Sequence, residues 1–518
     1  MSQSSFVKST IILTIATLIS KILGSIFRIP LQNIAGDEVL GIFSLVYPVY
    51  MVALILSVAG LPLAISKLIA EARSKNDTLS IRDIYRTASI LAILFGLISF
   101  LLLFTFSTEI AGLLGGPSIR PALIVVSATL LFAPYMAIYR GFFQGFNDMR
   151  PTAVSQVIEQ FIRASLIIAI AYYMVSHHFS NTEIAGGIMV GSIIGVIGSL
   201  LYLWMKYRSA PFKASHTKRY TTKHFRTWSK RILAVSIPIA IGSITMALFN
   251  VVDSITVSYG LRSTGVTDSE VHYLYGVYSR GLILVQIATV FATSVVLPLV
   301  PLITAKLSQK DYQGTRSIME RTHEMTSMIS WPIAIVLFVL AAPLNLALFM
   351  NLEGSWVLAI IGFSSIFTCL TLIGTGILQG INLAKLAAII IIGGVLFKTF
   401  SNIILIHLYG LEGAAISTLL VYLLVVILNT VLIIRKMHFS FLNRNSAKII
   451  LASIVMGAII GIPTFLIDFE AWNRGSALLY VFLASIIGGT AYFVQLYWFK
   501  IMDKTMLKRI PLIQKVFK

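Results

Sequence analysis

The chain has 518 residues, of which 57% are hydrophobic and 12% charged, and its mean hydropathy is +0.89. Soluble domains carry about 25% charged residues, so this composition excludes a large soluble enzyme and indicates an integral membrane protein. The formal net charge of +20 raises the question of nucleic-acid binding, which the placement of the basic residues answers below.

A helix that crosses the hydrocarbon core of a bilayer needs about 20 mostly apolar residues. By this criterion the sequence predicts fourteen spans, at 9–30, 39–66, 85–106, 118–140, 153–176, 184–205, 232–257, 275–304, 324–347, 355–378, 386–407, 411–434, 447–467 and 476–499. The first contains Lys21, lacks a small-x-small cleavage motif and continues into "RIPLQNIAGDE". We therefore expect a membrane span there, and not a cleaved signal peptide.

The distribution of Lys and Arg predicts the orientation of the spans, because cytoplasmic loops carry an excess of both. With a cytoplasmic N-terminus, most of the 40 Lys and Arg fall on the cytoplasmic side, and the outer loops hold only Arg28, Arg120, Arg262 and Arg474. We therefore expect both termini in the cytoplasm. The longest basic segment, 206–231, has nine Lys and Arg and no acid. It is typical of a positive-inside segment near anionic lipid, so we expect no nucleic-acid partner.

One motif occurs twice, as "GFFQGFNDMR" at 141–150 and as "GILQGINLAK" at 376–385. The two copies fall at span junctions that are six spans apart, hence on the same side of the membrane. This predicts two parallel repeats related by an axis along the membrane normal. The predicted organisation is an N-lobe at 1–205, a basic cytoplasmic linker at 206–231, a C-lobe at 232–434, and two further spans with a basic tail at 435–518.

The residues of the motif favour a structural role over direct substrate contact. Gly141 with Gly145, and Gly376 with Gly380, are pairs of small residues four apart that allow two helices to approach closely. The Gln and Asn of the motif can bond freed backbone groups at the helix end, and the final basic residue suits the headgroup layer.

Cations inside the predicted spans are the strongest functional signal. Each costs about 2.5–3.5 kcal/mol at mid-membrane, although Arg86 lies near a helix end and can snorkel. Glu159 could pair with Arg163 four residues later. After Glu159 and Asp253 are counted, three positive charges remain in surplus, which indicates an aqueous cavity for an anionic headgroup. The predicted substrate-binding residues are Lys21, Arg28, Arg163, Arg280 and Lys398.

Asp253 lies in the apolar run "SITMALFNVVDSITVSYG" and has two interpretations. It either neutralises a nearby cation, with Arg280 on the next helix as the first choice, or binds a coupling ion. We favour the first, because cations are in surplus.

Catalytic and metal-binding signatures point to no enzyme. The sequence has no G-x-S-x-G, Walker loop, H-E-x-x-H or cysteine cluster. The adjacent His177 and His178 favour an interfacial pair over a metal site, and the single Cys369 favours a packing role. We expect no cofactor, and a coupling ion, sodium or proton, is left open.

Three stretches carry a resemblance to a known family: "SKILGSIFRIPLQNIAGDEVLGIFSLVYPVY" (20–50), "GLPLAISKLIAEARSKND" (60–77) and "GFFQGFNDMRPTAVSQVIEQFIR" (141–163). The chain resembles the stage V sporulation protein B and polysaccharide-biosynthesis transporter family. This family belongs to the multidrug/oligosaccharidyl-lipid/polysaccharide exporter superfamily, to which the MurJ-type lipid II flippases also belong. The resemblance implies an all-α, V-shaped fold of two six-helix lobes plus an accessory helix pair.

The implied activity is alternating-access flipping of undecaprenyl-linked saccharide precursors in the bacterial cytoplasmic membrane, for cell-wall, spore-cortex or polysaccharide synthesis. In lipid II flippases, basic residues on helices 1 and 8 line the cavity, and the matching helices here carry Lys21, Arg28 and Arg280. The flippases also have a basic residue on helix 2, where this chain has Tyr47 and Tyr50, which argues against strict lipid II specificity. Asp253 is similar in placement to an acid of the family's cation site.

The sequence leaves three functions to compare. A flippase, acting as a monomer on a lipid-linked oligosaccharide among membrane lipids, explains the surplus of cations. An ion-coupled multidrug efflux pump of the same superfamily would have an acidic cavity and twelve spans. A membrane glycosyltransferase or ligase would need catalytic residues near an outer loop, where only Asp468, Glu470 and the histidine pair are found. We favour the flippase.

Overall fold

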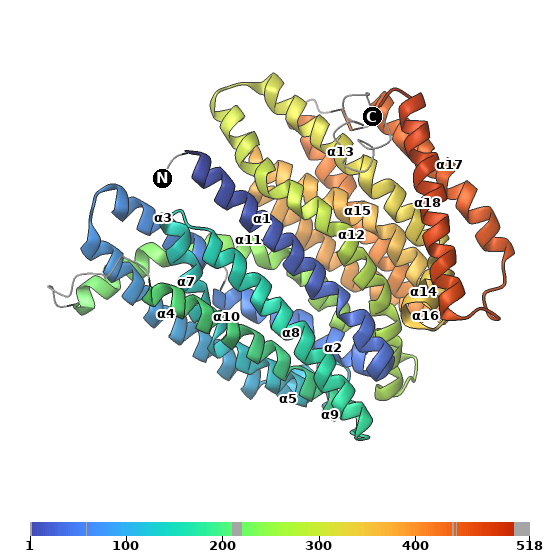
Figure 1. Cartoon of the computed structure of the whole chain (residues 1–518), viewed down its shortest axis with the longest axis horizontal. Coiled ribbons are helices and arrows are strands. Elements are labelled where there is room, and N and C mark those ends of the chain that lie inside the picture. The colour runs from blue at the N-terminus through green and yellow to red at the C-terminus, as the bar shows by residue number, and fades with distance from the viewer. Residues whose placement is uncertain (1–2, 59, 210–219, 438–439, 442, 502–518) are drawn as a thin grey trace. The chain divides into compact units, whose positions relative to one another are not determined.

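The computed structural model describes residues 3–58, 60–209, 220–437, 440–441 and 443–501, and these form helices joined by short loops (Figure 1). The parts of the predicted linker and tail at 210–219 and 502–518 lie outside the described residues. Up to α11 the helices are α1 (Gln3–Ile26), α2 (Arg28–Val58), α3 (Leu61–Ser74), α4 (Thr78–Thr105), α5 (Ser107–Leu114), η1 (Pro117–Ile119), α6 (Arg120–Ser127), η2 (Ala128–Leu131), α7 (Ala133–Gly145), α8 (Arg150–Ser176), α9 (Asn181–Ile188), α10 (Val190–Arg208) and α11 (Thr222–Ser263). The later helices are α12 (Asp268–Ser308), α13 (Tyr312–Val339), α14 (Ala341–Phe349), α15 (Ser355–Gly380), α16 (Ala384–Met437), α17 (Arg444–Leu466) and α18 (Arg474–Trp498).

Eleven helical runs in the described residues are long and apolar enough to cross a membrane, which confirms an all-helical, multi-pass membrane protein. Two of these runs are much longer than one crossing: Ile12–Ser74 has 63 residues and Ala384–Met437 has 54. Regular helix is interrupted in each, at Gly36 (φ 81°) and at Gly410 (φ 56°). Left-handed values of this kind suit glycine, which has no Cβ.

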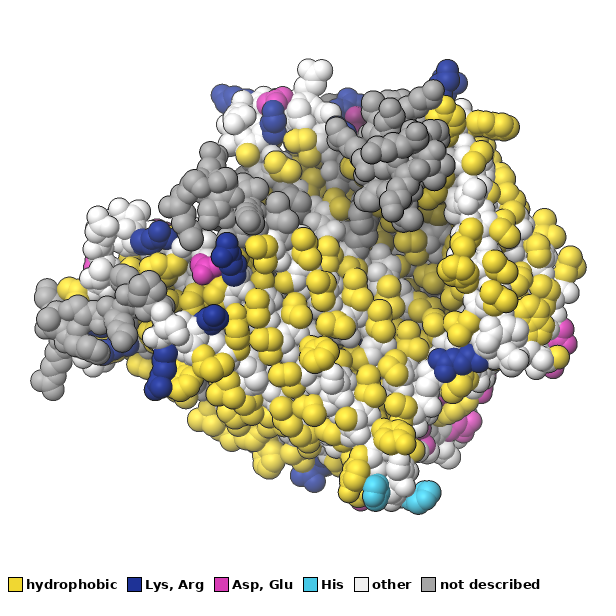
Figure 2. Space-filling view, in the orientation of Figure 1, with side chains coloured by type: hydrophobic (Ala, Val, Ile, Leu, Met, Phe, Trp, Pro, Cys, Tyr) yellow, Lys and Arg dark blue, Asp and Glu magenta, His cyan; other side chains and the backbone are white. Residues whose placement is uncertain are grey.

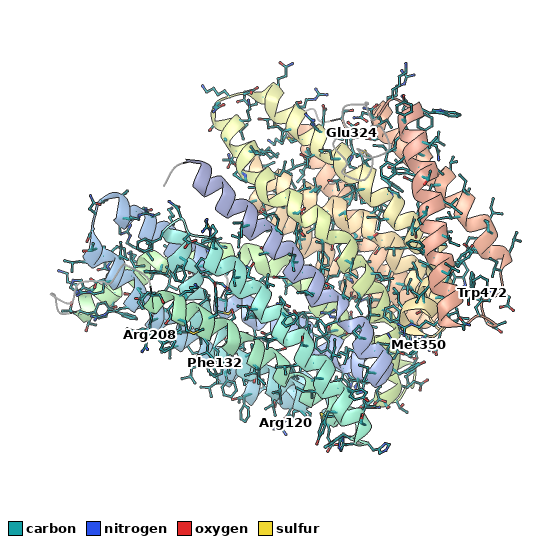
Figure 3. The ribbon with its side chains drawn as sticks, viewed as in Figure 1. Arg120, Phe132, Arg208, Glu324, Met350 and Trp472 are labelled. Carbon is teal, nitrogen blue, oxygen red and sulfur yellow. The ribbon has the colours of Figure 1, made fainter. Side chains whose placement is uncertain are left out.

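The surface is that of a protein surrounded by lipid. Hydrophobic side chains cover most of the face shown in Figure 2, and large apolar residues such as Phe400 and Ile462 are exposed. Charged residues occur at helix ends: Figure 3 marks Arg120 at the start of α6 and Arg208 at the end of α10. The Arg208 guanidinium lies 3.9 Å from the centroid of the Trp204 ring, an amphipathic pair that suits the membrane–water interface.

The chain divides into two compact units, each considered by itself. Unit 1 comprises Met1–Ser279 and Lys398–His407, and unit 2 comprises Arg280–Phe397 and Leu408–Lys518. Unit 1 thus contains α1 to α11, the first part of α12 and a segment of α16.

The repeated glycines bring helices into close contact in both units, as the motif predicted. In unit 1, α7 packs against α3, and a Cβ on Gly145 would lie 2.8 Å from the Ile69 side chain. In unit 2, a Cβ on Gly380 of α15 would lie 2.8 Å from the Ile303 side chain of α12. Neither site has room for a larger residue without movement of its neighbour.

The repeated asparagines end the two motif helices through their backbone. Asn147 has φ 61° and Asn382 has φ 63°, and the N–H of each donates to the carbonyl of the motif glutamine, Gln144 or Gln379, at 2.9 and 3.2 Å. Asparagine tolerates the left-handed conformation better than other non-glycine residues, and helices often end on such a residue. The backbone conformation, more than the amide bonding that we expected, therefore accounts for the repeated Asn.

A second structural echo was missed in the sequence. Asp77 precedes α4 and accepts a hydrogen bond from the Ser80 N–H at 3.0 Å, while Asp311 precedes α13 and accepts one from the Gly314 N–H at 2.8 Å. The residue before each Asp is also left-handed. Two N-caps at equivalent positions of the repeat therefore start equivalent helices.

Candidate functional site

Arg28, at the start of α2, is 8% exposed. It lies against two aromatic rings from the part of α2 that follows the break at Gly36. Its guanidinium carbon is 4.9 Å from the Tyr47 centroid and 5.4 Å from the Phe43 centroid. The two rings stack on each other with their centroids 5.5 Å apart. Aromatic faces attract a guanidinium but do not neutralise its charge, and the Arg28 Nε has no hydrogen-bond partner.

Arg163, on α8, faces the same tyrosine. It is 7% exposed, and its guanidinium carbon lies 6.0 Å from the Tyr47 centroid. The side chain donates to the Gln160 carbonyl oxygen, and its Nε is likewise buried without a partner. Glu159, which we considered as a partner for Arg163, instead forms its ion pair with Arg140 at 2.8 Å.

Lys21 completes a group of three cations in unit 1. It is exposed on α1, which packs against α8. One turn later, a Cβ on Gly24 would lie 3.0 Å from Gln160 Oε1 and 3.6 Å from Arg163 Nη2. The structure therefore brings Arg28 and Arg163 together at Tyr47, and Lys21 lies on α1 about one turn before the Gly24–Arg163 approach. We name these three residues the triple-cation cluster.

The triple-cation cluster has no carboxylate partner in the described part of the chain, since none of the ion pairs found there includes one of its members. Buried positive charge without a counter-ion is unfavourable. The cluster can therefore accept an anion. Guanidinium groups suit phosphate in particular, because their planar N–H donors bind two of its oxygens together.

Asp253, on α11, lies in a fully buried polar network, also within unit 1. Its Oδ2 accepts a hydrogen bond from the Lys398 ammonium at 2.7 Å and from the Tyr278 hydroxyl at 3.1 Å, and its Oδ1 accepts one from the Asn402 amide at 3.1 Å. The Asp253 and Lys398 side chains are 2% and 1% exposed. The cation in contact with Asp253 is Lys398, where we expected Arg280.

Arg280 belongs to unit 2 and is 1% exposed. Its Nη1 donates to Asn345 Oδ1 at 3.0 Å and to the Glu353 carbonyl oxygen at 3.2 Å, and the guanidinium lies 5.6 Å from the centroid of the Phe349 ring. These contacts connect α12 with α14 and with the loop before α15. Its expected contact with substrate stays a prediction.

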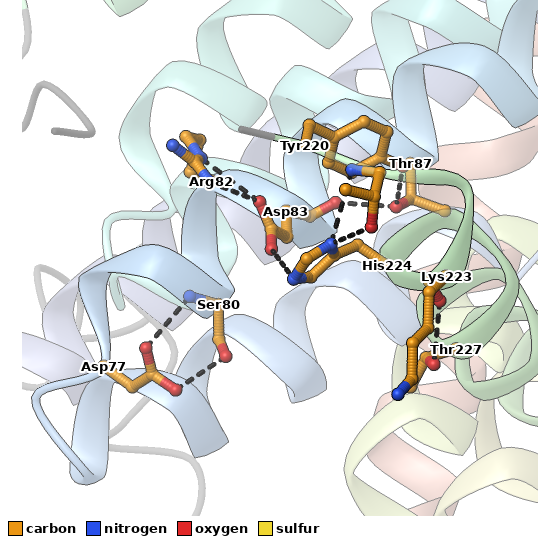
Figure 4. A network of polar contacts seen from close by, with 10 residues as sticks. Asp77, Ser80, Arg82, Asp83, Thr87, Tyr220, Lys223, His224 and Thr227 are labelled. Carbon is orange, nitrogen blue, oxygen red and sulfur yellow. Dashed lines mark hydrogen bonds and ion pairs between the residues drawn. The ribbon is translucent and has the colours of Figure 1, made fainter. Parts of the chain in front are cut away.

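Residues 220–231, the second described part of the predicted basic linker, contact α4 through Tyr220 and His224 (Figure 4). The Tyr220 hydroxyl lies 2.7 Å from the Thr87 hydroxyl. His224 lies 3.9 Å from Asp83, whose carboxylate is already paired with Arg82 at 3.0 Å. This segment begins α11 by a capping box between Thr221 and His224.

Sequence reasoning missed Tyr47 as the common neighbour of two arginines, and Asn402 and Tyr278 as partners of Asp253. The available signal was spacing: Asn402 follows Lys398 by one helical turn, as Tyr47 follows Phe43.

His177 packs on Tyr173 with ring centroids 4.2 Å apart, and no group of three potential metal-binding side chains occurs among the described residues. Cys369 is buried.

The sequence matches a known protein family over more than half of its length. Residues 6–305 match the sequence profile of the family described as "Polysaccharide biosynthesis protein". Three relatives from Bacillus subtilis (strain 168) align with nearly the whole chain. The uncharacterized membrane protein YabM is 29% identical (98% of this chain, 95% of the relative), lipid II flippase MurJ is 25% identical (98% and 98%), and stage V sporulation protein B is 25% identical (100% and 99%).

Solved structures show the same fold. A lipid II flippase MurJ in an inward closed conformation superposes with a TM-score of 0.67 at 18% identity, covering 94% of this chain and 98% of the other. An inward-facing multidrug resistance MATE family transporter superposes with a TM-score of 0.60 at 17% identity, covering 82% and 94%. The chain therefore has the same fold as these two proteins.

Proposed function

Because the chain belongs to the polysaccharide biosynthesis protein family, we propose that it is an alternating-access flippase for an undecaprenyl-linked, pyrophosphate-bearing saccharide. The observation that carries the proposal is the triple-cation cluster. It combines two buried guanidiniums and one exposed ammonium in a protein that crosses the membrane many times. A pyrophosphate supplies the negative charge that these three groups lack, and it is the part that all such lipid-linked saccharides share.

The proposed arrangement is six plus six plus two spans, fourteen in all. It reconciles the eleven runs with the sequence prediction, because Ile12–Ser74 and Ala384–Met437 each have the length of two crossings. The 42-residue α11 supplies the remaining span. We place the lobes at 1–205 and 232–434, joined by the linker 206–231 and followed by 435–518.

The proposed location is the bacterial cytoplasmic membrane, with both termini in the cytoplasm and the protein active as a monomer. The Lys and Arg bias between loops supports this orientation. Relatives named as a lipid II flippase and a sporulation protein support a pathway in cell-wall, spore-cortex or polysaccharide synthesis.

The fold of multidrug transporters supports a second candidate, an efflux pump for organic cations. The triple-cation cluster argues against it, because three positive charges outside the ion pairs of the described residues repel a cationic substrate. A substrate with a pyrophosphate gains from the same charges. The sign of the charge thus favours the flippase.

The test is flipping of a fluorescent undecaprenyl-pyrophosphate saccharide in proteoliposomes. We expect Arg28→Gln with Arg163→Gln to abolish flipping, and the matched change of an exposed helix-end arginine, Arg208→Gln, to leave it intact. Flipping at the wild-type rate in the double variant would reject the triple-cation cluster as the site. Uptake of an organic cation in place of flipping would favour the efflux pump. Complementation of a strain depleted of its lipid II flippase then decides whether lipid II is among the substrates.

A further inference from the structure

The buried network around Asp253 contains its own cation. The Lys398 ammonium lies 2.7 Å from Asp253 Oδ2, and both side chains are almost completely buried. A buried carboxylate is unfavourable unless an opposite charge lies beside it. Lys398 supplies that charge from the neighbouring segment of α16, so the carboxylate is neutralised by the chain itself.

The other groups that face the carboxylate are also hydrogen-bond donors. Tyr278 donates its hydroxyl to Oδ2, and Asn402 donates its amide to Oδ1. A sodium ion would need the reverse, because hard cations are bound by the lone pairs of oxygen ligands. The carboxylate is therefore surrounded by an ammonium, a hydroxyl and an amide that all donate hydrogen bonds to it.

The orientation of Asn402 follows from its neighbours. Thr256 donates its hydroxyl hydrogen to the Val252 carbonyl at 2.6 Å, so the Thr256 oxygen is free only to accept. The Asn402 atom that faces both this oxygen, at 2.7 Å, and the Asp253 carboxylate must then be the donating NH2 group. The Asn402 carbonyl oxygen points elsewhere, and it is buried without a partner.

We propose that Lys398 is a tethered cation that occupies, at Asp253, the place of a mobile coupling ion, so that transport is not driven by a sodium gradient. A sodium ion at this carboxylate would meet the like charge of Lys398 within hydrogen-bond distance and two further donors, Tyr278 and Asn402. The independence of transport from a sodium gradient rests on the proposed function. The occupancy of the site by Lys398 is tested without transport.

Removal of the tethered charge should convert the network into a sodium site. In the variant Lys398→Asn, the shorter side chain leaves space beside the carboxylate and brings a carbonyl oxygen. The Thr256 oxygen is already present, and Asn402 can turn its unpartnered carbonyl oxygen inward. The matched control is Lys398→Met, which removes the same charge and adds no oxygen ligand.

The first experiment compares thermal unfolding of the purified protein in sodium chloride and in N-methylglucamine chloride at equal ionic strength. We expect the wild-type midpoint to be the same in both salts. Lys398→Asn should unfold at a lower temperature and regain several degrees as sodium increases, with saturation, whereas Lys398→Met should not respond. A network that is only structural would leave both variants equally destabilised in both salts, which would overturn the proposal.

The second experiment measures flipping by the wild type in proteoliposomes with and without a sodium gradient. We expect rates within a factor of two of each other. A tenfold loss of rate without the gradient would overturn the proposal, as would a saturable, sodium-specific rise of the wild-type midpoint that disappears in Asp253→Asn. The wild-type measurements decide the matter even if Lys398→Asn does not fold. Failure to flip under every condition would count against the proposed function and would leave the tethered cation to the unfolding experiment.

Discussion

Asn147 and Asn382, 235 positions apart, adopt the same left-handed backbone, with φ 61° and 63°. Each follows the last turn of a helix whose glycines pack closely against another helix of the same unit. The repeated motif thus specifies both a helix contact and the point where the helix stops. The residue type at each position follows from geometry alone, and no substrate contact is needed to explain it.

This equivalence predicts matched effects of substitution at the two asparagines. Asn147→Ala and Asn382→Ala should each lower the free energy of unfolding by about 1 kcal/mol, because a Cβ without a compensating polar group disfavours the left-handed region. The corresponding glycine variants should be close to the wild type. Thermal unfolding of the purified protein in detergent checks this, and alanine and glycine variants of equal stability would contradict it.

The motif glycines should be intolerant of even one added carbon. Gly145→Ala and Gly380→Ala place a Cβ 2.8 Å from an isoleucine side chain, and overpacking of this kind costs about 1–3 kcal/mol. Gly393→Ala on α16 is the control, because a Cβ there meets nothing within 4 Å and alanine favours helix. Unfolding midpoints should fall for the first two variants and not for the third. Three equal midpoints would refute the packing role.

The Asp253–Lys398 pair should show strong coupling in a double-mutant cycle. Asp253→Asn alone leaves a buried ammonium without its counter-ion, and loss of one partner of a buried pair costs about 3–5 kcal/mol. The double variant Asp253→Asn with Lys398→Met removes both charges and should recover much of this loss. Unfolding of the four proteins gives the coupling energy. Simple additivity of the two single changes would show that the ion pair does not contribute.

The two aspartate caps predict a loss of stability in acid. Hydrogen bonds from Ser80 hold the pKa of Asp77 below its usual value, and the bond from the Lys306 ammonium does the same for the pKa of Asp311. Because both folded-state pKa values are lowered, the ionised caps stabilise the protein fully above the unfolded pKa of about 3.9. This stabilisation is lost as the pH falls through the folded pKa.

Asparagine at both positions keeps the cap and removes the titration. The wild type should therefore unfold at a higher temperature than Asp77→Asn with Asp311→Asn at pH 7, and the difference should shrink as the pH falls below about 3.9. Unfolding midpoints of both proteins across this range provide the measurement. A difference that stays constant with pH would show that the two carboxylates contribute no pH-dependent stability.

Much of the fold follows from the sequence because the bilayer imposes it. Apolar runs of about 20 residues must become helices, since no water is present to bond exposed backbone groups, and the structure has helices in these runs. The repeated glycines likewise predicted close helix contacts, which Gly145 and Gly380 make. The equivalent helix caps at Asp77 and Asp311 were missed in the sequence, because a cap requires one suitable residue and a particular backbone angle rather than a long repeated motif.

The sequence by itself determined that buried cations outnumber buried acids, because charges can be counted along the chain. Only the tertiary structure decided how they pair. Glu159 binds Arg140 and not Arg163 one turn away, and Asp253 binds Lys398, 145 positions later. Helical spacing constrains neighbours on one helix, whereas an ion pair between helices depends on how each rotates and packs against the others. That packing brings Arg28 and Arg163 to Tyr47 without an ion-pair partner and places Lys398 beside Asp253.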